Sequence, residues 1–294
     1  MTRKYFVNPT IELLALLSVV VVLLLSGCGG TSSASTSSAS ATATATRAAS
    51  GTTGSATLKH APRGTATISW TPTSQSLTVK ISLIDLAPSS THPAHVHSGS
   101  CTKQGAVVYT LNNVLADARG VGSSTTVIKN VKTVPAGELN IIVHNGPGLA
   151  PADQDLPIVC SDLTFTHLSP TSPLSVQVPL DAAPGSDASE TASGTAQLKV
   201  SGSTLTVKLT LSGLQPGSSH AAHIHAGSCE SEGAVIYPLS NVVADASGKS
   251  ISTTTIKNVS SIPGHGWYVN VHYSTDLATQ TGFDPIACGN VTVR

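Results

Sequence analysis

The chain has 294 residues, a formal net charge of zero and only 10% charged residues. This balance excludes the basic surface that nucleic-acid binding requires, and the length leaves room for two ordinary domains. Aromatic residues are scarce, at 3%, while Ser, Thr, Ala, Gly and Val dominate. Such a composition favours small-residue β-sheets with many turns over helical bundles.

The N-terminus has the features of an export signal. Arg3 and Lys4 are followed by an apolar run over residues 13–25 and then by "LSGC", which ends at Cys28. This motif resembles the bacterial lipobox, in which the cysteine is lipidated and becomes the first residue of the mature protein. We therefore expect a lipoprotein signal peptide at residues 1–27, a lipid on Cys28, and an exported protein anchored to the outer face of the bacterial cell membrane. A plain transmembrane anchor and a signal peptide with a chance cysteine are the alternatives.

The segment after the signal, residues 28–53, is rich in Ser, Thr and Ala and has almost no large apolar side chain. It cannot bury a core, so we expect a flexible tether. Without residues 1–27 the chain keeps 13 basic and 14 acidic residues, a net charge of −1. The lipid, rather than electrostatic attraction, is therefore expected to hold the protein on the membrane.

An internal repeat organises the rest of the chain. "THPAHVHSGSC" at residues 91–101 returns as "SHAAHIHAGSC" at 219–229, and "IKNV" at 128–131 returns at 256–259, so both motifs recur at the same offset along the chain. This spacing predicts two similar domains joined by a segment rich in Pro, Ser and Asp. The predicted ranges are 54–167 for the first domain, 168–190 for the linker and 191–294 for the second domain.

Four cysteines remain once Cys28 is assigned to the lipid, and four cysteines allow three pairings. One disulfide within each repeat is the simplest arrangement, because the two cysteines are equally far apart in both repeats. An exported protein can keep such bridges, and a loop of this size stabilises a domain by about 4 kcal/mol in the chain-entropy model. Four free thiols are the alternative. The predicted bridges are Cys101–Cys160 and Cys229–Cys288.

Alternating apolar and polar residues predict strands over residues 76–83 and 204–211, and further strands are expected at 138–145 and 266–273. Turn signals such as "QPGSS" and "DASGK" separate the strands at short intervals. The expected fold class is all-β, and each repeat is expected to be a small antiparallel sandwich or barrel.

The repeated H-x-x-H-x-H motif predicts a metal site. Residues i and i+2 of a strand point to the same face, so the last two histidines of each motif can converge on one ion. A third ligand must come from a neighbouring strand, and His144 and His272 are the candidates. Three neutral imidazoles without a thiolate suit copper, with zinc the less favoured metal. The predicted ligands are His95, His97 and His144 in the first repeat and His223, His225 and His272 in the second.

A set of structural histidines that bond to loop carbonyls is the alternative to a metal site. His60, His167 and His265 have no counterpart in the other repeat, and we expect them to be surface residues.

The second repeat resembles the copper/zinc superoxide dismutase domain. The shared elements are "HAAHIH", a disulfide cysteine, "NVVADASGK", "VNVH" and "ACGNV", in the order found in the family. The resemblance covers most of residues 205–293 and, more weakly, 77–165. It implies a Greek-key β-barrel, copper bound to the six predicted ligands, and disulfides that match those predicted from spacing. It also implies that His92 and His220 support the site without binding metal.

Several features of that family are missing. The histidine shared by copper and zinc falls near Val107 and Val235, the zinc loop is absent, and no arginine precedes the last cysteine in "DLPIVC" or "FDPIAC". The chain also resembles the CHRD domain, an extracellular β-domain with similar "HxHxG" and "GPVVFPL" motifs and a poorly defined function. The CHRD resemblance accounts better for the short middle loop.

Two functional hypotheses follow. The first is a lipid-anchored protein with tandem superoxide dismutase-like domains that binds copper and turns over superoxide slowly, because a fourth histidine and a steering cation are missing. The second is a non-catalytic CHRD-like surface module for adhesion, matrix binding or metal storage. The sequence identifies no catalytic residue and no protein partner.

Overall fold

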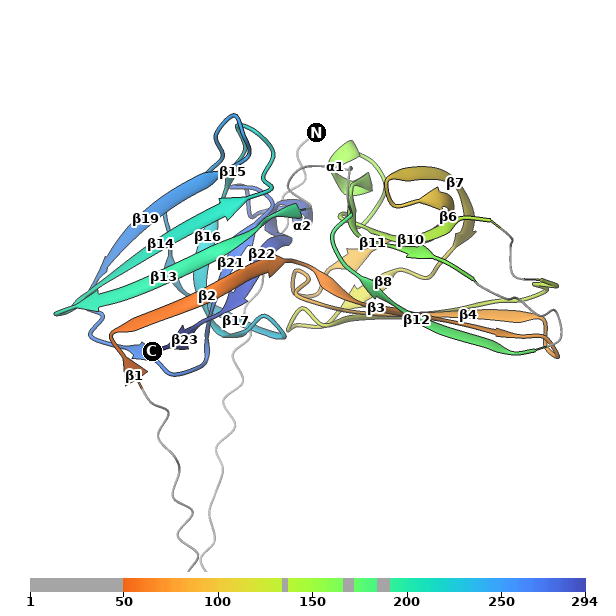
Figure 1. The fold of residues 1–294 in the computed structure, drawn as a ribbon, viewed down its shortest axis with the longest axis horizontal. Helices are drawn as coiled ribbons and strands as arrows, with labels where there is room; N and C mark the ends of the chain where they lie inside the picture. Colours follow the sequence, from red (N-terminus) through yellow and green to blue (C-terminus); the bar gives the residue numbers. More distant parts are fainter. Residues whose placement is uncertain (1–49, 134–136, 166–171, 184–190) are drawn as a thin grey trace, which may run out of the picture. The chain divides into compact units, whose positions relative to one another are not determined.

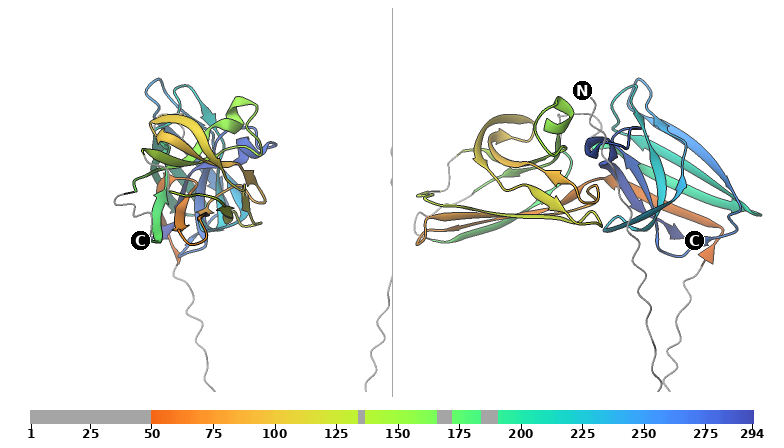
Figure 2. Two further views of the ribbon diagram at one scale, coloured as in Figure 1. Left: turned by 90° about the vertical axis from the view of Figure 1, so that its right-hand side faces the viewer. Right: turned by 180° about the vertical axis from the view of Figure 1, so that it is seen from behind.

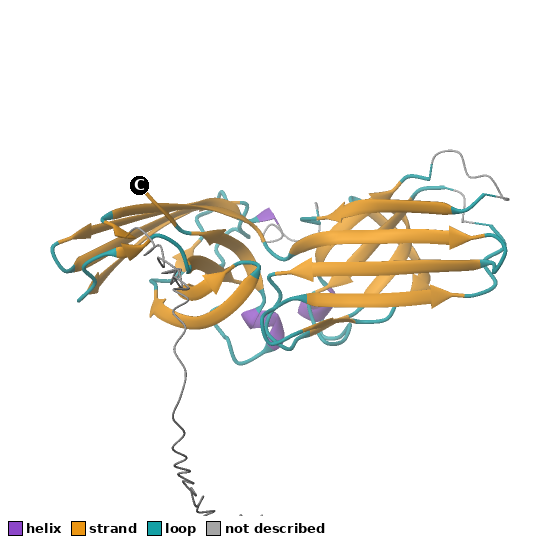
Figure 3. Ribbon diagram, turned by 90° about the horizontal axis from the view of Figure 1, so that it is seen from below, coloured by secondary structure: helices purple, strands orange, loops and turns teal. Residues whose placement is uncertain are grey.

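The computed structural model describes residues 50–133, 137–165, 172–183 and 191–294. Nearly all regular structure in these ranges is β-strand, drawn in orange in Figure 3, which confirms the predicted all-β fold class. The predicted signal peptide, Cys28, most of the tether and His167 lie outside the described residues. Within the described ranges, no helix combines the length and apolarity needed to cross a membrane.

The first lobe contains two antiparallel sheets and a short helix. Its elements are β3 (Arg63–Thr71), β4 (Ser76–Ile84), β5 (Thr91–His92), β6 (Ala94–Ser100), β7 (Lys103–Thr110), β8 (Val114–Ala116), β9 (Gly122–Ile128), β10 (Leu139–His144), α1 (Ala152–Asp155), β11 (Pro157–Leu163) and β12 (Leu174–Leu180). One sheet has the order β12-β3-β4-β9-β8-β5 and the other has the order β11-β10-β6-β7. Between β4 and β9 the chain crosses to the second sheet and returns, the connection expected of a Greek-key fold.

The second lobe repeats this plan, with its two sheets joined into one. Its elements are β2 (Thr53–His60), β13 (Ser193–Ser201), β14 (Thr204–Ser212), β15 (Ser219–His220), β16 (Ala222–Ser228), β17 (Ser231–Pro238), β18 (Val242–Val243), β19 (Ser250–Lys257), β20 (Ile262–Pro263), β21 (Trp267–His272), α2 (Gln280–Phe283), β22 (Pro285–Asn290) and β23 (Thr292–Val293), with β1 (Ser50–Gly51) paired to β20. The main sheet has the order β17-β16-β21-β22-β2-β13-β14-β19. Figure 2 shows the curled sheets of both lobes from behind.

Each lobe has its own hydrophobic core, because alternate side chains of its strands point inward. The four inward residues of β4, from Leu77 to Leu83, are at most 3% exposed, and the four of β14, from Leu205 to Leu211, are at most 2% exposed. The alternation predicted for residues 76–83 and 204–211 is thus the alternation observed. Burial of each such side chain contributes roughly 1.5–3 kcal/mol.

β2 pairs with the second lobe, although it precedes the first lobe in the sequence. It lies between β13 and β22, with Leu58 opposite Gly194 and Lys59 opposite Cys288. Ala56 and Leu58 pack in the core of the second lobe. Figure 1 shows the orange β2 alongside the teal β13.

β12 makes the reciprocal exchange. It pairs with β3 of the first lobe, from Leu174 opposite Trp70 to Leu180 opposite Gly64, and Asp181 forms a bridge to Cys160 of β11. Leu180 packs in the core of the first lobe, where β12 occupies the place that β2 occupies in the second. The two repeats have therefore exchanged their first strands.

This exchange differs from the boundaries expected from the repeat. The segment expected to be a linker, 168–190, contains β12, and β2, expected at the start of the first domain, completes the second lobe. The physical reason is that both strands alternate apolar and polar residues in the same way, so both suit the open edge of either sheet.

Both predicted disulfides are present, Cys101–Cys160 with Cα atoms 5.9 Å apart and Cys229–Cys288 with Cα atoms 6.0 Å apart. The second bridge is buried, with each of its cysteines 1% exposed, whereas Cys101 is only half-buried.

Candidate metal centres

Two adjacent strands position the histidines in each lobe. In the first lobe β6 contains His95 and His97, and the neighbouring strand β10 ends at His144. The antiparallel register places Ile142 of β10 opposite His95, so His144 comes just beyond the paired residues. β16 and β21 have the same arrangement in the second lobe.

A β-bulge shapes the strand around the second histidine of each pair. The register of β6 against β7 shifts on both sides of His97, and that of β16 against β17 shifts on both sides of His225. The glycine two residues later has a positive φ, +89° at Gly99 and +103° at Gly227, and a Cβ there would lie 2.3 or 2.5 Å from a carbonyl oxygen. The "HxHxG" motif therefore contains the glycine that the bulge requires.

The three predicted ligands of the first lobe form a compact triad. His95 Nδ1 and His144 Nε2 are 3.1 Å apart. The ring centroid of His95 lies 5.5 Å from that of His97 and 5.2 Å from that of His144, and the centroids of His97 and His144 are 6.2 Å apart. One potential ligand nitrogen of each ring lies within 4.8 Å of the others. With bonds of about 2 Å, three nitrogens at these distances can bind one metal ion.

The second lobe reproduces this geometry. His223 Nδ1 and His272 Nε2 are also 3.1 Å apart. The centroid separations, in the same order, are 5.6, 5.1 and 6.0 Å. Each value is close to its counterpart in the first lobe, so the repeat has kept the relative placement of the rings as well as their identity.

Backbone carbonyls determine which ring nitrogen is available in two histidines of each triad. In each of these rings Nδ1–H donates to a main-chain oxygen, so in the neutral ring Nε2 keeps its lone pair. This tautomer follows from the hydrogen-bond network. The four bonds are His97 to Gly105 at 3.1 Å, His144 to Asp155 at 2.7 Å, His225 to Gly233 at 3.0 Å and His272 to Phe283 at 2.5 Å.

The second triad contains a buried nitrogen that makes no hydrogen bond. Nε2 of His225 has no partner among the described residues, and His225 is 2% exposed. An unsatisfied buried group of this kind costs about 1–3 kcal/mol. In the first lobe the side-chain amide of Gln104 lies 3.2 Å from Nε2 of His97. A metal ion would satisfy the nitrogen of His225, so the residues present fit a bound metal.

Burial favours the neutral form of these imidazoles. It is the main cause that lowers the pKa of His95, His144, His223 and His225, and it lowers the pKa of His272 to about 4. The neutral ring is the form that binds a metal ion, so these ligands need not lose a proton at neutral pH.

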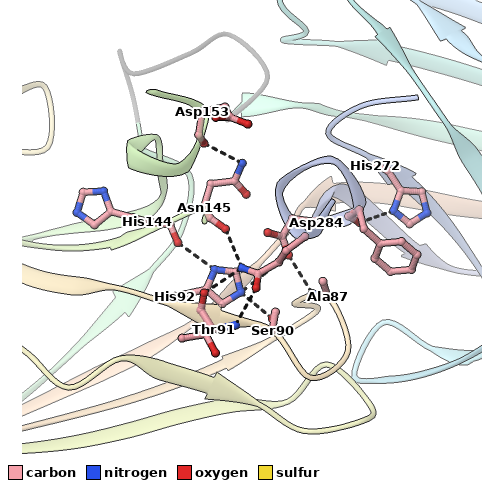
Figure 4. Close-up of polar contacts among 11 residues, drawn as sticks. Ala87, Ser90, Thr91, His92, His144, Asn145, Asp153, His272 and Asp284 are labelled. Carbon is pink, nitrogen blue, oxygen red and sulfur yellow. Dashed lines mark hydrogen bonds and ion pairs between the residues drawn. The ribbon is translucent and has the colours of Figure 1, made fainter. Parts of the chain in front are cut away.

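A fourth histidine supports the third ligand of each triad. His92 is buried; its Nδ1–H donates to the carbonyl of His144 at 2.9 Å, and its Nε2 accepts from the Ser90 hydroxyl at 2.7 Å. Figure 4 shows this pair of contacts. In the second lobe His220 makes the same bonds: its Nδ1–H donates to the carbonyl of His272 at 3.0 Å, and its Nε2 accepts from the Ser218 hydroxyl at 2.6 Å. Because both ring nitrogens are engaged elsewhere, His92 and His220 can orient a predicted ligand and offer no ring nitrogen to a metal ion themselves.

The six predicted ligands thus lie in two triads, one in each lobe. Among the histidines expected at the surface, His265 is exposed. The prediction for His60 was wrong, since it is 7% exposed and its Nε2 lies 2.9 Å from the carbonyl of Ile158. The strand exchange explains the difference, because it buries the end of β2.

Some residues that orient the ligands were missed by sequence reasoning. Ser90 and Ser218 are equivalent positions of the two repeats, so the repeat contained a signal for them. The main-chain carbonyls that accept the Nδ1–H of His144 and of His272 belong to Asp155 and Phe283. Any residue supplies a carbonyl, so these acceptors leave no signal in the sequence.

Asp85 also lies close to Cys229 and Cys288. The two sulfurs form a disulfide and are not thiolates, so this group is not a metal site.

Comparison with known families matches the CHRD domain to residues 175–276. The match begins within β12 and includes the whole second triad. A search of curated proteins finds no match. The second repeat is therefore similar to the CHRD domain.

Proposed function

We propose that this chain is a surface protein that binds copper in two three-histidine sites, one in each lobe, and acts as a non-catalytic CHRD-like module. The CHRD match supports the kind of module, and the two matching triads support the metal. The proposal depends most on Nε2 of His225, which is buried and without a hydrogen-bond partner in the described part of the chain, while Nδ1 of the same ring is already bonded.

The donor set favours copper over other common metals. Three neutral imidazoles without carboxylate or thiolate ligands suit copper first and zinc second, and they do not suit calcium or magnesium. Copper, when bound, supplies one-electron chemistry between Cu(II) and Cu(I). The histidines would bind the ion, and His92, His220 and the backbone carbonyls would fix their orientation.

The experiment is copper titration of the full chain, with metal content measured after removal of free copper. We expect two copper ions per chain, one ion after His272→Ala or His144→Ala, and none after both changes. His265→Ala is the matched control, because His265 is exposed and belongs to neither triad. Equal copper content in the wild type and the His272→Ala variant would show that the second triad is not a metal site.

Attachment to the outer face of the cell membrane through a lipid on Cys28 is part of the proposal. Its support is the "LSGC" motif followed by a segment without a core-forming pattern. Cys28→Ala should abolish lipid labelling and release the protein from membranes. A variant that keeps its lipid would contradict the assignment.

Superoxide dismutation is the second candidate function. The half-buried ring of His223 favours it, because this ligand leaves the second site accessible to a small anion. Val107 and Val235 lie opposite His97 and His225 in the register, and half of each valine is exposed, 50% and 47%. These valines stand near the position where the dismutase family has its shared histidine, and valine offers no ligand atom. We therefore expect superoxide turnover far below the diffusion limit of about 10⁹ M⁻¹s⁻¹. Pulse radiolysis of the copper-loaded chain measures this rate directly.

A further inference from the structure

One short segment of the second lobe contacts both histidine sites. It consists of α2 and the next residue, Asp284. On the side of the second site, the carbonyl of Phe283 accepts the Nδ1–H of His272 at 2.5 Å. The side chains of Gln280, Thr281 and Asp284 reach the first lobe.

Gln280 bonds to the main chain next to the first site. The Thr91 N–H donates to its Oε1 at 3.1 Å, and its Nε2 donates to the carbonyls of Thr91 at 2.9 Å and Asn145 at 3.2 Å. Thr91 precedes His92, and Asn145 follows His144. One glutamine therefore joins the strand of the supporting histidine to the strand of the third ligand.

Asp284 holds the loop that leads to the supporting histidine and packs beside its ring, without a hydrogen bond to it. Its carboxyl group is buried; Oδ1 accepts from the Ala87 N–H at 3.1 Å and lies 3.9 Å from Nε2 of His92. On its other side His92 donates to the carbonyl of His144 at 2.9 Å. Figure 4 shows Asp284 between Ala87 and His92, with His144 beyond.

The first repeat cannot return this contact. The position equivalent to Gln280 in the first repeat is Ala152, and the position equivalent to Asp284 is Leu156. Neither alanine nor leucine has a side-chain hydrogen-bonding group. The support is unequal: Gln280 and Asp284 have no side-chain counterparts in the first repeat. In return, the first lobe offers the carboxylate of Asp153, which accepts from the Thr281 hydroxyl of α2 at 3.1 Å.

We propose that Gln280 and Asp284 of the second lobe are positioning residues for the copper site of the first lobe. The inference depends on the proposed function, because it concerns the ligands of a proposed site. Residues that orient a metal-bound histidine typically change metal affinity by about 10–100-fold when they are replaced. The two residues act through His92 and Asn145 and touch neither copper nor its ligand nitrogens.

The test uses the full chain with one site removed at a time. In the His272→Ala background, copper binds only to the first site. There we expect Asp284→Leu, which introduces the residue of the first repeat, to lower copper affinity about 10-fold and to change the Cu(II) EPR hyperfine splitting. Asp284→Asn keeps an oxygen acceptor and should restore the parent spectrum. Gln280→Ala should change the same spectrum less strongly, and it tests the inference if Asp284→Leu fails to fold.

The controls separate positioning from general stability. In the His144→Ala background, copper binds only to the second site, and the same variants should leave affinity and spectrum unchanged. Asp276→Asn is the matched variant nearby, because Asp276 bonds within its own loop, to the Ala278 N–H at 3.0 Å. An equal loss at both sites, or an unchanged first site in Asp284→Leu, would overturn the inference. If the wild-type chain binds no copper, the proposed function itself fails; if it binds two ions and the variants change nothing, only the positioning role fails.

Discussion

The two triads have different neighbours although their rings are placed alike. Around the first triad, the amide of Gln104 lies 3.2 Å from one ligand nitrogen, and the carboxylate of Asp155 lies 3.4 Å from a ring nitrogen of another ligand. Around the second, Tyr268 stacks on one ligand ring at 5.0 Å and Phe283 lies 4.8 Å from another. The same ligand geometry thus forms in a polar and in an aromatic surrounding. Strand register and backbone carbonyls, which the lobes share, are sufficient to set that geometry.

The lobes also differ in where their first strands come from. β12 follows the strands of the first lobe in the sequence and joins that lobe. β2 precedes all the strands of the first lobe and joins the second lobe. Neither lobe can complete its sheet from its own repeat alone. An isolated fragment of residues 191–294 therefore lacks β2 and cannot test the proposed copper site of the second lobe.

The largest effect we expect comes from a charge placed in one exchanged strand. Leu58 and Leu180 are each 1% exposed, in the cores of the second and first lobe respectively. Leu58→Asp should destabilise the second lobe, and Leu180→Asp the first, each by about 4 kcal/mol or more, because an unpaired carboxylate would be buried. Hydrogen exchange read peptide by peptide identifies which lobe loses protection.

The control for that experiment is Thr57→Asp, on the exposed face of β2, which should change protection little. If Leu58→Asp instead exposed the amides of β3 and β4, each repeat would have kept its own first strand and the exchange would be refuted.

Much of the fold could be predicted because it repeats and alternates. The period-2 pattern of β4 and β14 identified core strands, and the constant offset between the repeats paired each ligand histidine with its counterpart. The exchange could not be predicted, because β2 and β12 have the same pattern and either sheet accepts them. The CHRD match illustrates this: it begins at residue 175 and so includes a strand that the fold uses in the other lobe.

The parts of the site that differ between lobes had no such signal. Asp284 corresponds to Leu156, so the repeat gave no reason to single it out. Its partner, the supporting His92, lies in the other lobe, far earlier in the chain, and only the folded structure brings them to 3.9 Å. Comparison of the repeats identifies the residues that both repeats share, whereas the contact between the lobes uses Asp284, which the first repeat lacks.

The disulfides offer a second, smaller contrast. Both close loops of the same length, with a sequence separation of 59 between their cysteines, so loop entropy predicts an equal loss of about 4 kcal/mol when either is replaced by two serines. The second bridge packs in a buried cluster with Ala61 and Tyr268, whereas Cys101 is half-buried. Serine hydroxyls in the buried cluster add a cost of about 1 kcal/mol or more. Denaturant unfolding should therefore show the larger loss for the second pair; equal losses would mean that packing around it contributes nothing.

The smallest predicted effect concerns a pair of buried carboxyl groups, Glu232 and Asp85. The equivalent positions of the other repeat, Gln104 and Gly213, have no carboxyl group. Glu232 is buried, while its counterpart Gln104 is exposed, and it interacts with the fully buried Asp85 of the first lobe. Asp85 has a φ of +65° at the position where the second repeat has Gly213, and its Oδ2 lies 3.6 Å from Arg63. Burial is the main cause that raises the pKa of both carboxyls.

A raised carboxyl pKa makes stability fall with increasing pH. Above about pH 4.5 the unfolded chain has lost the proton of Glu232 while the folded chain still binds it, so every unit of pH up to the raised pKa costs up to about 1.4 kcal/mol. Glu232→Gln cannot titrate, and it should gain about 1–3 kcal/mol over the wild type at pH 8 and much less at pH 4.5. Urea unfolding of the copper-free chain at a series of pH values measures this difference.

The loss of stability at acid pH should be the same in Glu232→Gln as in the wild type. Burial lowers the pKa of His92 and His272 to about 4, so the folded chain excludes protons that the unfolded chain binds, and stability is lost as pH falls from about 6.5 to 4. Glu230→Gln is the control, since Glu230 is exposed and its contact with Arg63 at 3.4 Å should contribute well under 1 kcal/mol. A Glu232→Gln curve that stays parallel to the wild type from pH 5 to 9 would show that the proton of Glu232 is bound no more tightly in the folded chain than in the unfolded one. If Glu232→Gln no longer lost stability between about pH 6.5 and 4, Glu232 would be coupled to the titration of the histidines. The burial of His92 and His272 does not by itself require such coupling.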